Sequence, residues 1–199
     1  MNDSGRIIIC GVGGQGILLA SDLLCGYLMS RGLDVKKSEV HGMAQRGGSV
    51  VTHVTWGTRV FAPLIGRGEC DLILSFELIE SLRWLEYLRE GGTLITSRYT
   101  INPISNKNLK FQYPESKLAA VASAHDWQVY FTDMSELKGD VINLKSANIF
   151  MMGILSKLID SSVPDWYNII KSRVPGKYIE MNLKAFDSGR TAVLGKPSL

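Results

Sequence analysis

A glycine-rich turn near the N-terminus is the first segment whose residue types and spacing could support chemistry. Gly11-Val12-Gly13-Gly14-Gln15-Gly16, here the glycine turn, satisfies G-x-G-x-x-G between a run typical of a strand and a run typical of a helix. Such a turn has little room for a Cβ atom and exposes N–H groups at the positive end of the helix, where a phosphate can bind. The candidate ligand-binding residues in it are Gly11, Gly13, Gly14, Gln15 and Gly16. The alternative is that these glycines only allow the strand to pack closely on the helix, with the turn facing another subunit.

A second glycine segment runs from His41 to Ser49 and reads H-G-M-A-Q-R-G-G-S. It combines an amide, a guanidinium and glycines with no carboxylate, a set of hydrogen-bond donors that suits an anion. If the strand before it runs parallel to the first strand, both glycine segments lie at the same sheet edge. The candidate binding residues in it are Gln45, Arg46, Gly47 and Gly48. A structural loop with Arg46 on the surface is the alternative.

Other polar residues lie near expected strand ends. Glu39 ends the second predicted strand, where a dinucleotide-binding protein places the carboxylate that binds the ribose. Glu77 directly follows a buried strand, so it either contacts a ligand or partner or is favoured by the dipole in the first turn of a helix. His41 could assist binding, whereas we expect His53 and His125 to be solvated or packed. The sequence has no Ser-His-Asp order, no close Cys-His pair and no cluster with metal-ligand spacing, so we predict no catalytic residue and no metal site in this chain.

The elements that must position these residues alternate between strands and helices. Apolar runs and alternating patterns predict strands at residues 6–12, 34–40, 50–56, 71–76, 93–96 and 128–132, with a short piece at 60–62. Helical spacing predicts helices at residues 15–31, 77–90, 114–125, 145–159, 165–170 and 178–186. This order is typical of an α/β protein with a Rossmann-like three-layer fold, in which a mostly parallel sheet carries helices on both faces. The helix at 145–159 is apolar on nearly all sides, so it must be central in the core or covered by another chain.

Length and composition set the broad class. The 199 residues, 45% hydrophobic and 21% charged, fit one domain spanning residues 1–199, with a polar tail at 187–199 that we expect to be flexible. The net charge of +3 is too small to indicate a nucleic-acid partner, and no apolar stretch is long enough to cross a membrane. Cys10, Cys25 and Cys70 are isolated, so we do not expect this chain alone to hold an iron–sulfur cluster. With no disulfide framework and no signal peptide, we expect a cytoplasmic protein.

The motifs, taken together, resemble the gamma subunit or gamma domain of the 2-oxoacid:ferredoxin oxidoreductases. The resemblance rests on G-V-G-G-Q-G-I at residues 11–17, G-M-A-Q-R-G-G-S-V at 42–50 and D-L-I-L-S-F-E at 71–77, in the right order over about the first 100 residues. A weaker match covers K-S-A-N at 145–148 with Gly153. Within the family, the sequence is most similar to the small (beta) subunits of the indolepyruvate ferredoxin oxidoreductases.

This resemblance implies an enzyme complex of anaerobic metabolism. Such a complex oxidatively decarboxylates a 2-oxo acid, here indolepyruvate or pyruvate, with coenzyme A, and yields an acyl-CoA, carbon dioxide and reduced ferredoxin. Thiamine diphosphate, magnesium and the iron–sulfur clusters belong to partner subunits or domains, in agreement with the isolated cysteines of this chain. The resemblance places a wall of the active site, and coenzyme A contacts, at the glycine turn and the Gln45-Arg46 loop. It also implies a hetero-oligomer with a large subunit, with ferredoxin reached through the complex; the isolated chain would be inactive and could form a homodimer.

Two other functions compete with this interpretation. A free-standing NAD(P)-binding Rossmann oxidoreductase would use Gly11, Gly13, Gly16 and Glu39, and would transfer hydride without partners. An adenylating enzyme of the ubiquitin-activating type also carries a G-x-G-G-x-G turn and would exchange ATP with pyrophosphate. The sequence lacks the downstream catalytic cysteine or zinc pair of that type.

Overall fold

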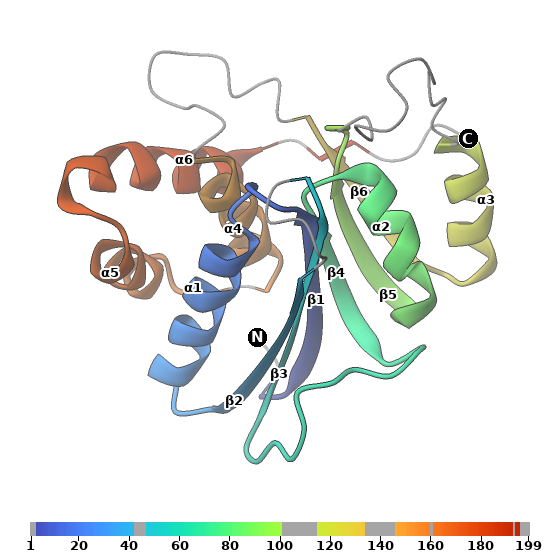
Figure 1. The fold of residues 1–199 in the computed structure, drawn as a ribbon, viewed down its shortest axis with the longest axis horizontal. Helices are drawn as coiled ribbons and strands as arrows, with labels where there is room; N and C mark the ends of the chain where they lie inside the picture. Colours follow the sequence, from blue (N-terminus) through green and yellow to red (C-terminus); the bar gives the residue numbers. More distant parts are fainter. Residues whose placement is uncertain are drawn as a thin grey trace.

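A sheet of six strands runs through the middle of the protein (Figure 1). This computed structural model describes residues 3–41, 47–100, 115–133, 146–159, 161–192 and 194–195. The strands are β1 (Gly5–Val12), β2 (Asp34–His41), β3 (Ser49–Gly57), β4 (Cys70–Ser75), β5 (Leu88–Ser97) and β6 (Gln128–Thr132), in the spatial order β2-β3-β1-β4-β5-β6. β1, β4, β5 and β6 pair in parallel, while β3 is antiparallel to both of its neighbours. The sheet is therefore mixed but mostly parallel, as the sequence predicts.

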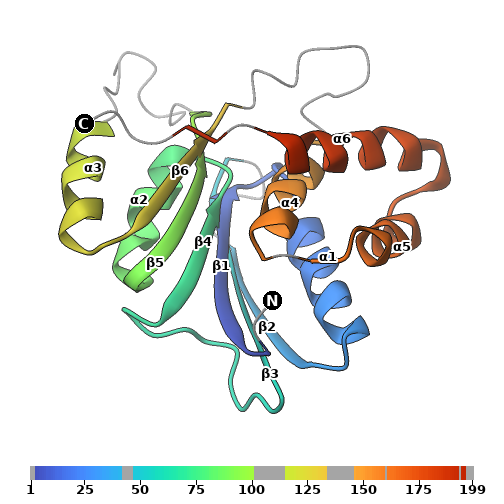
Figure 2. The ribbon, with the colours of Figure 1, turned by 180° about the vertical axis from the view of Figure 1, so that it is seen from behind.

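Helices cover both faces of the sheet, which confirms the predicted three-layer α/β fold (Figures 1 and 2). One face carries α1 (Ile17–Ser30), α4 (Ala147–Leu158), α5 (Val163–Arg173) and α6 (Ile179–Thr191). The other face carries α2 (Leu78–Trp84) and α3 (Glu115–Ala124). Short 3₁₀ helices follow α2 and α5, namely η1 (Leu85–Tyr87) and η4 (Gly176–Tyr178). In the part of the chain that the structure describes, no helix combines the length and apolar character needed to cross a membrane.

β1 shows why the central strands are continuous apolar runs. Successive side chains of a strand point to opposite faces of the sheet. Ile7 and Ile9 enter the core beneath α1, α4, α5 and α6, whereas Ile8 and Cys10 enter a second core beneath α2 and α3. Because both faces of β1 are buried, every apolar side chain of the run stabilises the fold whichever way it points.

The apolar helix predicted at residues 145–159 is central in the core of this chain. All of α4 from Ala147 to Ser156 is buried. α4 crosses α6 at two glycines, because a Cβ atom on Gly153 would lie 2.1 Å from the Phe186 carbonyl oxygen and one on Gly189 would lie 2.0 Å from the Phe150 carbonyl oxygen. The backbones of the two helices therefore touch, and α4 is covered by this chain's own elements.

The helix predicted at residues 77–90 is correct only in its first half. α2 ends at Trp84, η1 follows, and β5 already begins at Leu88, which pairs with Cys70 in β4. Gly91 has a φ of 65° and lies where the β4–β5 register shifts. Gly91-Gly92 therefore accommodates an irregular stretch of strand and does not end a helix. Pairing with β4 overrides the helical spacing of the leucines.

Two other predicted boundaries differ from the structure. Residues 60–62 form no strand, and the Val60 N–H donates instead to the Asp34 Oδ2 atom at 2.8 Å. The last helix continues past Phe186 to Thr191. Gly195 then exchanges two backbone hydrogen bonds with Phe131 in β6, at 2.7 and 2.9 Å. The predicted tail at 187–199 therefore begins inside α6.

Candidate functional site

The glycine turn joins the end of β1 to the start of α1, and the side chain of Gln15 closes it. The Gln15 Oε1 atom accepts a hydrogen bond from the Val12 N–H at 2.7 Å, and the Nε2 atom donates to the Phe76 carbonyl oxygen at 3.0 Å. The Gln15 N–H also donates to the Val12 carbonyl oxygen at 3.1 Å. Gln15 thus lies in the turn where the sequence predicts a site residue, but its amide is bonded to this chain.

The glycines of the turn have different surroundings. A Cβ atom on Gly11 would lie 2.6 Å from Gln15 Oε1 and 2.8 Å from a methyl carbon of Ile17. Gly16 has a φ of 79°, and a Cβ atom there would lie 2.5 Å from the Asn148 Nδ2 atom. Gly14 has a φ of 102°, and its Cβ position has no neighbour within 4 Å among the described residues. Gly11 and Gly16 therefore allow close packing, whereas no described residue packs against the Cβ position of Gly14.

The second glycine segment meets the glycine turn, which confirms that both lie at the same edge of the sheet. The Gly13 N–H donates to the Gly48 carbonyl oxygen at 2.8 Å, and the Gly47 N–H donates to the Gly13 carbonyl oxygen at 3.4 Å. Ser49 begins β3 and pairs with Val12, the last residue of β1. We call this meeting place the glycine edge. Gln45 and Arg46 lie outside the described residues.

The start of α2 contributes two buried acids to the glycine edge. Glu77 is 1% exposed and caps α2, because its Oε2 atom accepts from the Glu80 N–H at 2.9 Å. Two roles are predicted for Glu77, a contact with a ligand or partner and an acid favoured at the start of a helix. The structure thus shows the second. Glu80 is 6% exposed, and its Oε2 atom accepts from the Ser49 hydroxyl at 2.5 Å. Sequence reasoning missed Glu80, although an acid three residues after a capping residue is a recognisable sign of a helix start.

Glu39 is not placed as a ribose-binding residue. Its Oε1 atom pairs with Lys37 Nζ, which also pairs with Asp22 of α1. In addition, β3 lies between β1 and β2, so Glu39 is separated from the glycine turn by a whole strand. Dinucleotide-binding folds place the carboxylate strand next to the glycine-turn strand. The geometry therefore gives no support to the free-standing NAD(P)-binding alternative.

The cysteines are packed thiols. Cys10, Cys25 and Cys70 are all buried. Burial raises the pKa of the Cys25 thiol to about 11 and that of Cys70 to about 12, and it raises the pKa of Cys10 further still. Buried neutral thiols are poor nucleophiles and poor metal ligands. Within the described ranges, no three His, Cys, Asp or Glu residues are grouped so that they could hold a metal ion.

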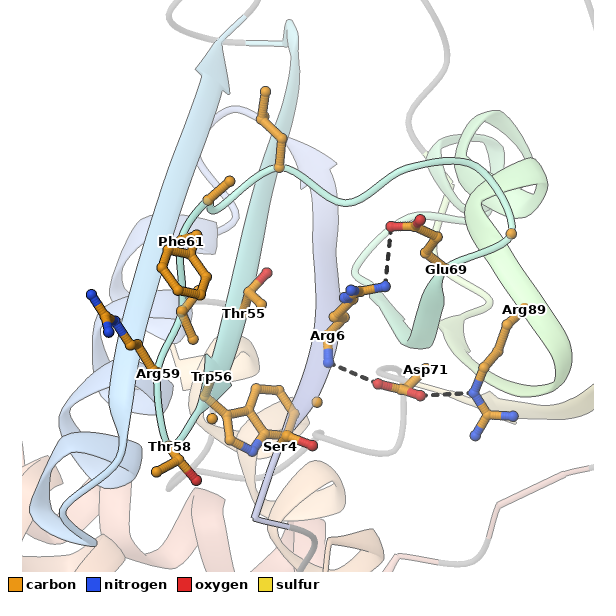
Figure 3. Close-up of a pocket in the computed structure, with 16 residues that line it drawn as sticks. Ser4, Arg6, Thr55, Trp56, Thr58, Arg59, Phe61, Glu69, Asp71 and Arg89 are labelled. Carbon is orange, nitrogen blue, oxygen red and sulfur yellow. Dashed lines mark hydrogen bonds and ion pairs between the residues drawn. The ribbon is translucent and has the colours of Figure 1, made fainter.

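A separate hollow of about 1040 Å³ lies at the opposite edge of the sheet, where β1 and β4 begin (Figure 3). Four charged side chains in its wall form two ion pairs, and the Arg59 guanidinium lies over the Phe61 ring. Arg6 Nη1 lies 3.0 Å from Glu69 Oε2, and Arg89 Nε lies 2.7 Å from Asp71 Oδ1. These groups neutralise each other, and the hollow is remote from both glycine segments. For these two reasons we do not take this hollow as the candidate site, although it is large.

Comparison with known proteins assigns the family. A model of the pyruvate ferredoxin/flavodoxin oxidoreductase family matches residues 6–192. The chain belongs to this family. Indolepyruvate oxidoreductase subunit IorB of Pyrococcus horikoshii is 35% identical over 188 residues, which cover 92% of this chain and 93% of the relative. The subunit of the same name from Archaeoglobus fulgidus is 32% identical and covers 97% of this chain and 98% of its own length.

Solved structures of the family share the fold. The gamma subunit of a keto/oxoacid ferredoxin oxidoreductase from Geobacter sulfurreducens matches with a TM-score of 0.66 at 24% identity, covering 93% of this chain and 95% of that one. The 2-oxoglutarate:ferredoxin oxidoreductase of Magnetococcus marinus, solved with 2-oxoglutarate, coenzyme A and succinyl-CoA, matches with a TM-score of 0.74 at 17% identity. This match covers 96% of our chain and 31% of that longer one.

The resemblance found in the sequence is therefore confirmed. The protein is a gamma-type small subunit of a 2-oxoacid:ferredoxin oxidoreductase, one part of a multi-subunit enzyme. Membership of such a complex implies thiamine diphosphate and iron–sulfur clusters in its partners.

Proposed function

We propose that this chain is the small subunit of an indolepyruvate-type 2-oxoacid:ferredoxin oxidoreductase. The assembled cytoplasmic enzyme converts a 2-oxo acid and coenzyme A into an acyl-CoA, carbon dioxide and reduced ferredoxin. The observation that carries this proposal is the 35% identity with IorB over 92% of the chain. In this proposal the partner is a large subunit that holds thiamine diphosphate, magnesium and the clusters. The isolated, buried cysteines of this chain support that division for the clusters.

The glycine edge is the contact that this chain offers to coenzyme A. Coenzyme A carries phosphates, and the start of α1 provides backbone N–H groups and the positive end of a helix dipole. Among the described residues, none lies within 4 Å of the Gly14 Cβ position, which leaves room on that side for a ligand to approach the backbone. Gln45 and Arg46, which directly precede Gly47 in the sequence, supply donors for an anion. Gln15 shapes the turn instead of binding, because its amide bonds to Val12 and Phe76.

Replacing Arg46 in the assembled enzyme tests this proposal. The large subunit is co-expressed with this chain, and reduction of ferredoxin is followed with indolepyruvate and with pyruvate. Arg46→Ala should weaken the use of coenzyme A by about 1.5–3 kcal/mol, the range for a hydrogen bond to a charged group. Arg67→Ala, which removes an exposed arginine paired with Glu86, is the matched control and should change nothing. Normal kinetics in Arg46→Ala would remove Arg46 from the site, and an assembled wild-type enzyme without turnover of any 2-oxo acid would refute the function.

A further inference from the structure

A buried carboxylate ties the second glycine segment to α2. The Ser49 hydroxyl donates to Glu80 Oε2 at 2.5 Å, and Glu80 Oε1 lies 3.3 Å from Arg83 Nε. Glu80 is almost fully buried, whereas the Arg83 side chain is 63% exposed. An exposed partner adds little to an ion pair. The Ser49–Glu80 bond is therefore the effective link, and it joins residues 31 positions apart.

The surroundings of Glu80 explain why a charged group is stable there. Burying a carboxylate is costly unless its oxygen atoms are hydrogen-bonded. Glu80 lies in the first turn of α2, where the helix dipole favours negative charge, and its own N–H is capped by Glu77. A hydrogen bond to a charged acceptor is short and directional, so it fixes Ser49 more firmly than an apolar contact would.

Ser49 lies where the Ser49–Glu80 bond can act on the glycine turn. Ser49 directly follows Gly47 and Gly48, the residues whose backbone groups bond to Gly13 in the glycine turn. It also pairs in register with Val12, whose N–H is held by Gln15. One end of the second glycine segment is therefore fixed both to the turn and to α2.

We propose that Glu80 is a positioning residue for the glycine edge. Through Ser49 it holds the C-terminal end of the second glycine segment against the glycine turn, and this placement sets the affinity for the phosphate-bearing part of coenzyme A. Glu80 itself touches no reacting atom. The identity of the ligand rests on the proposed function, whereas the mechanical role of the Ser49–Glu80 link does not.

Kinetics of the assembled enzyme test the effect on coenzyme A. Glu80→Ala and Ser49→Ala should each raise the KM for coenzyme A about tenfold, because the charge-assisted hydrogen bond that holds Ser49 beside the glycine turn is lost. The kcat and the KM for the 2-oxo acid should stay the same, since only ground-state binding is weakened. The double variant should raise the KM for coenzyme A no more than the single variant with the larger effect does. Ser49→Thr keeps the hydroxyl and should restore wild-type values, and Glu86→Gln, in the exposed pair with Arg67, is the matched control.

Hydrogen exchange on the full-length chain provides a readout that does not depend on activity. The amides of Gly13 and Gly47 should exchange faster in Glu80→Ala and Ser49→Ala, and at the wild-type rate in Glu86→Gln. Unchanged exchange at both amides would overturn the positioning role, as would a fall in kcat for every substrate without a change in the KM for coenzyme A. If the wild-type complex showed no turnover that depends on coenzyme A, the proposed function would fail, while the exchange result would still decide the role of Glu80.

Discussion

At the scale of single residues, Gln15 has more influence on the glycine turn than its place in the pattern suggests. G-x-G-x-x-G leaves this position unspecified. Its amide nevertheless bonds to Val12 at the end of β1 and to Phe76 after β4. The shape of a turn rich in glycine, which has many accessible conformations, is thus set by one side chain.

Gln15→Leu should lower the free energy of unfolding by about 1–3 kcal/mol, because it leaves the Val12 N–H and the Phe76 carbonyl group without their partner. Urea denaturation followed by circular dichroism measures the change. Gln15→Glu keeps an acceptor for Val12 but sets a carboxylate oxygen against the Phe76 carbonyl oxygen, so it should also lower the free energy of unfolding. An unfolding free energy equal to that of wild type in Gln15→Leu would show that water replaces both bonds at no cost.

His53 predicts a pH dependence of stability. It is 5% exposed, and its Nδ1 atom accepts a hydrogen bond from the Ile65 N–H at 3.2 Å. Burial lowers the pKa of His53 in the folded chain. Below about pH 6.5 the unfolded chain therefore binds a proton at His53 more strongly than the folded chain does. The free energy of unfolding consequently falls as the pH falls.

His53→Asn keeps an acceptor near the Nδ1 position and removes the titration. Urea midpoints at about pH 7.5 and about pH 5.5, on either side of the ordinary histidine pKa, should differ less in this variant than in wild type. If the urea midpoint changed between the two pH values by the same amount in His53→Asn as in wild type, the pH dependence would come from other groups.

At the scale of elements, the sequence predicts what local pattern determines and misses what distant partners determine. The strands and the start of α2 follow from apolar runs and from the acid at Glu77. The end of α2 does not, because Leu88 continues the helical spacing but pairs with Cys70 in β4. Likewise, Gln15 is predicted at the site, but its bond to Phe76 crosses 61 positions and leaves no local signal.

The crossing of α4 and α6 gives a prediction at this scale. Gly153→Ala should lower the free energy of unfolding by about 3 kcal/mol, the upper end for overpacking, because its Cβ atom would meet a backbone oxygen at 2.1 Å. Gly26→Ala in α1 is the matched control. Its Cβ atom would lie 3.4 Å from Ile169, so the gain in helix propensity should stabilise the chain by about 0.5–1 kcal/mol. Thermal unfolding measures the change in stability of both variants. If Gly153→Ala and Gly26→Ala changed the stability by similar amounts, the close crossing of α4 and α6 would be contradicted.

At the scale of the whole molecule, the glycine edge draws on both helical layers. α1 begins there from one face of the sheet and α2 from the other (Figure 1). The large hollow lies at the far edge of the sheet, where β1 and β4 begin, away from these helix starts. One edge of this subunit is thus organised around backbone donors, which is the feature on which the proposed contact with coenzyme A rests.

The isolated chain should be colourless and without activity toward 2-oxo acids. Its cysteines are buried thiols with raised pKa values, which does not suit cluster ligation. Visible absorption spectra and ferredoxin-reduction assays of the chain alone and of the co-purified complex measure both properties. Iron–sulfur absorbance in the chain alone would contradict the division of cofactors between subunits.

The contact between Gly16 and Asn148 has a consequence for the timing of assembly. The Asn148 Nδ2 atom donates to the Gly16 carbonyl oxygen at 3.4 Å, across 132 positions of the chain. During synthesis, the glycine turn leaves the ribosome long before Asn148 does. The Ala20 N–H already donates to the Gly16 carbonyl oxygen within α1, at 3.0 Å, so the turn and the helix start can form first, and the Asn148 contact is added only when α4 docks.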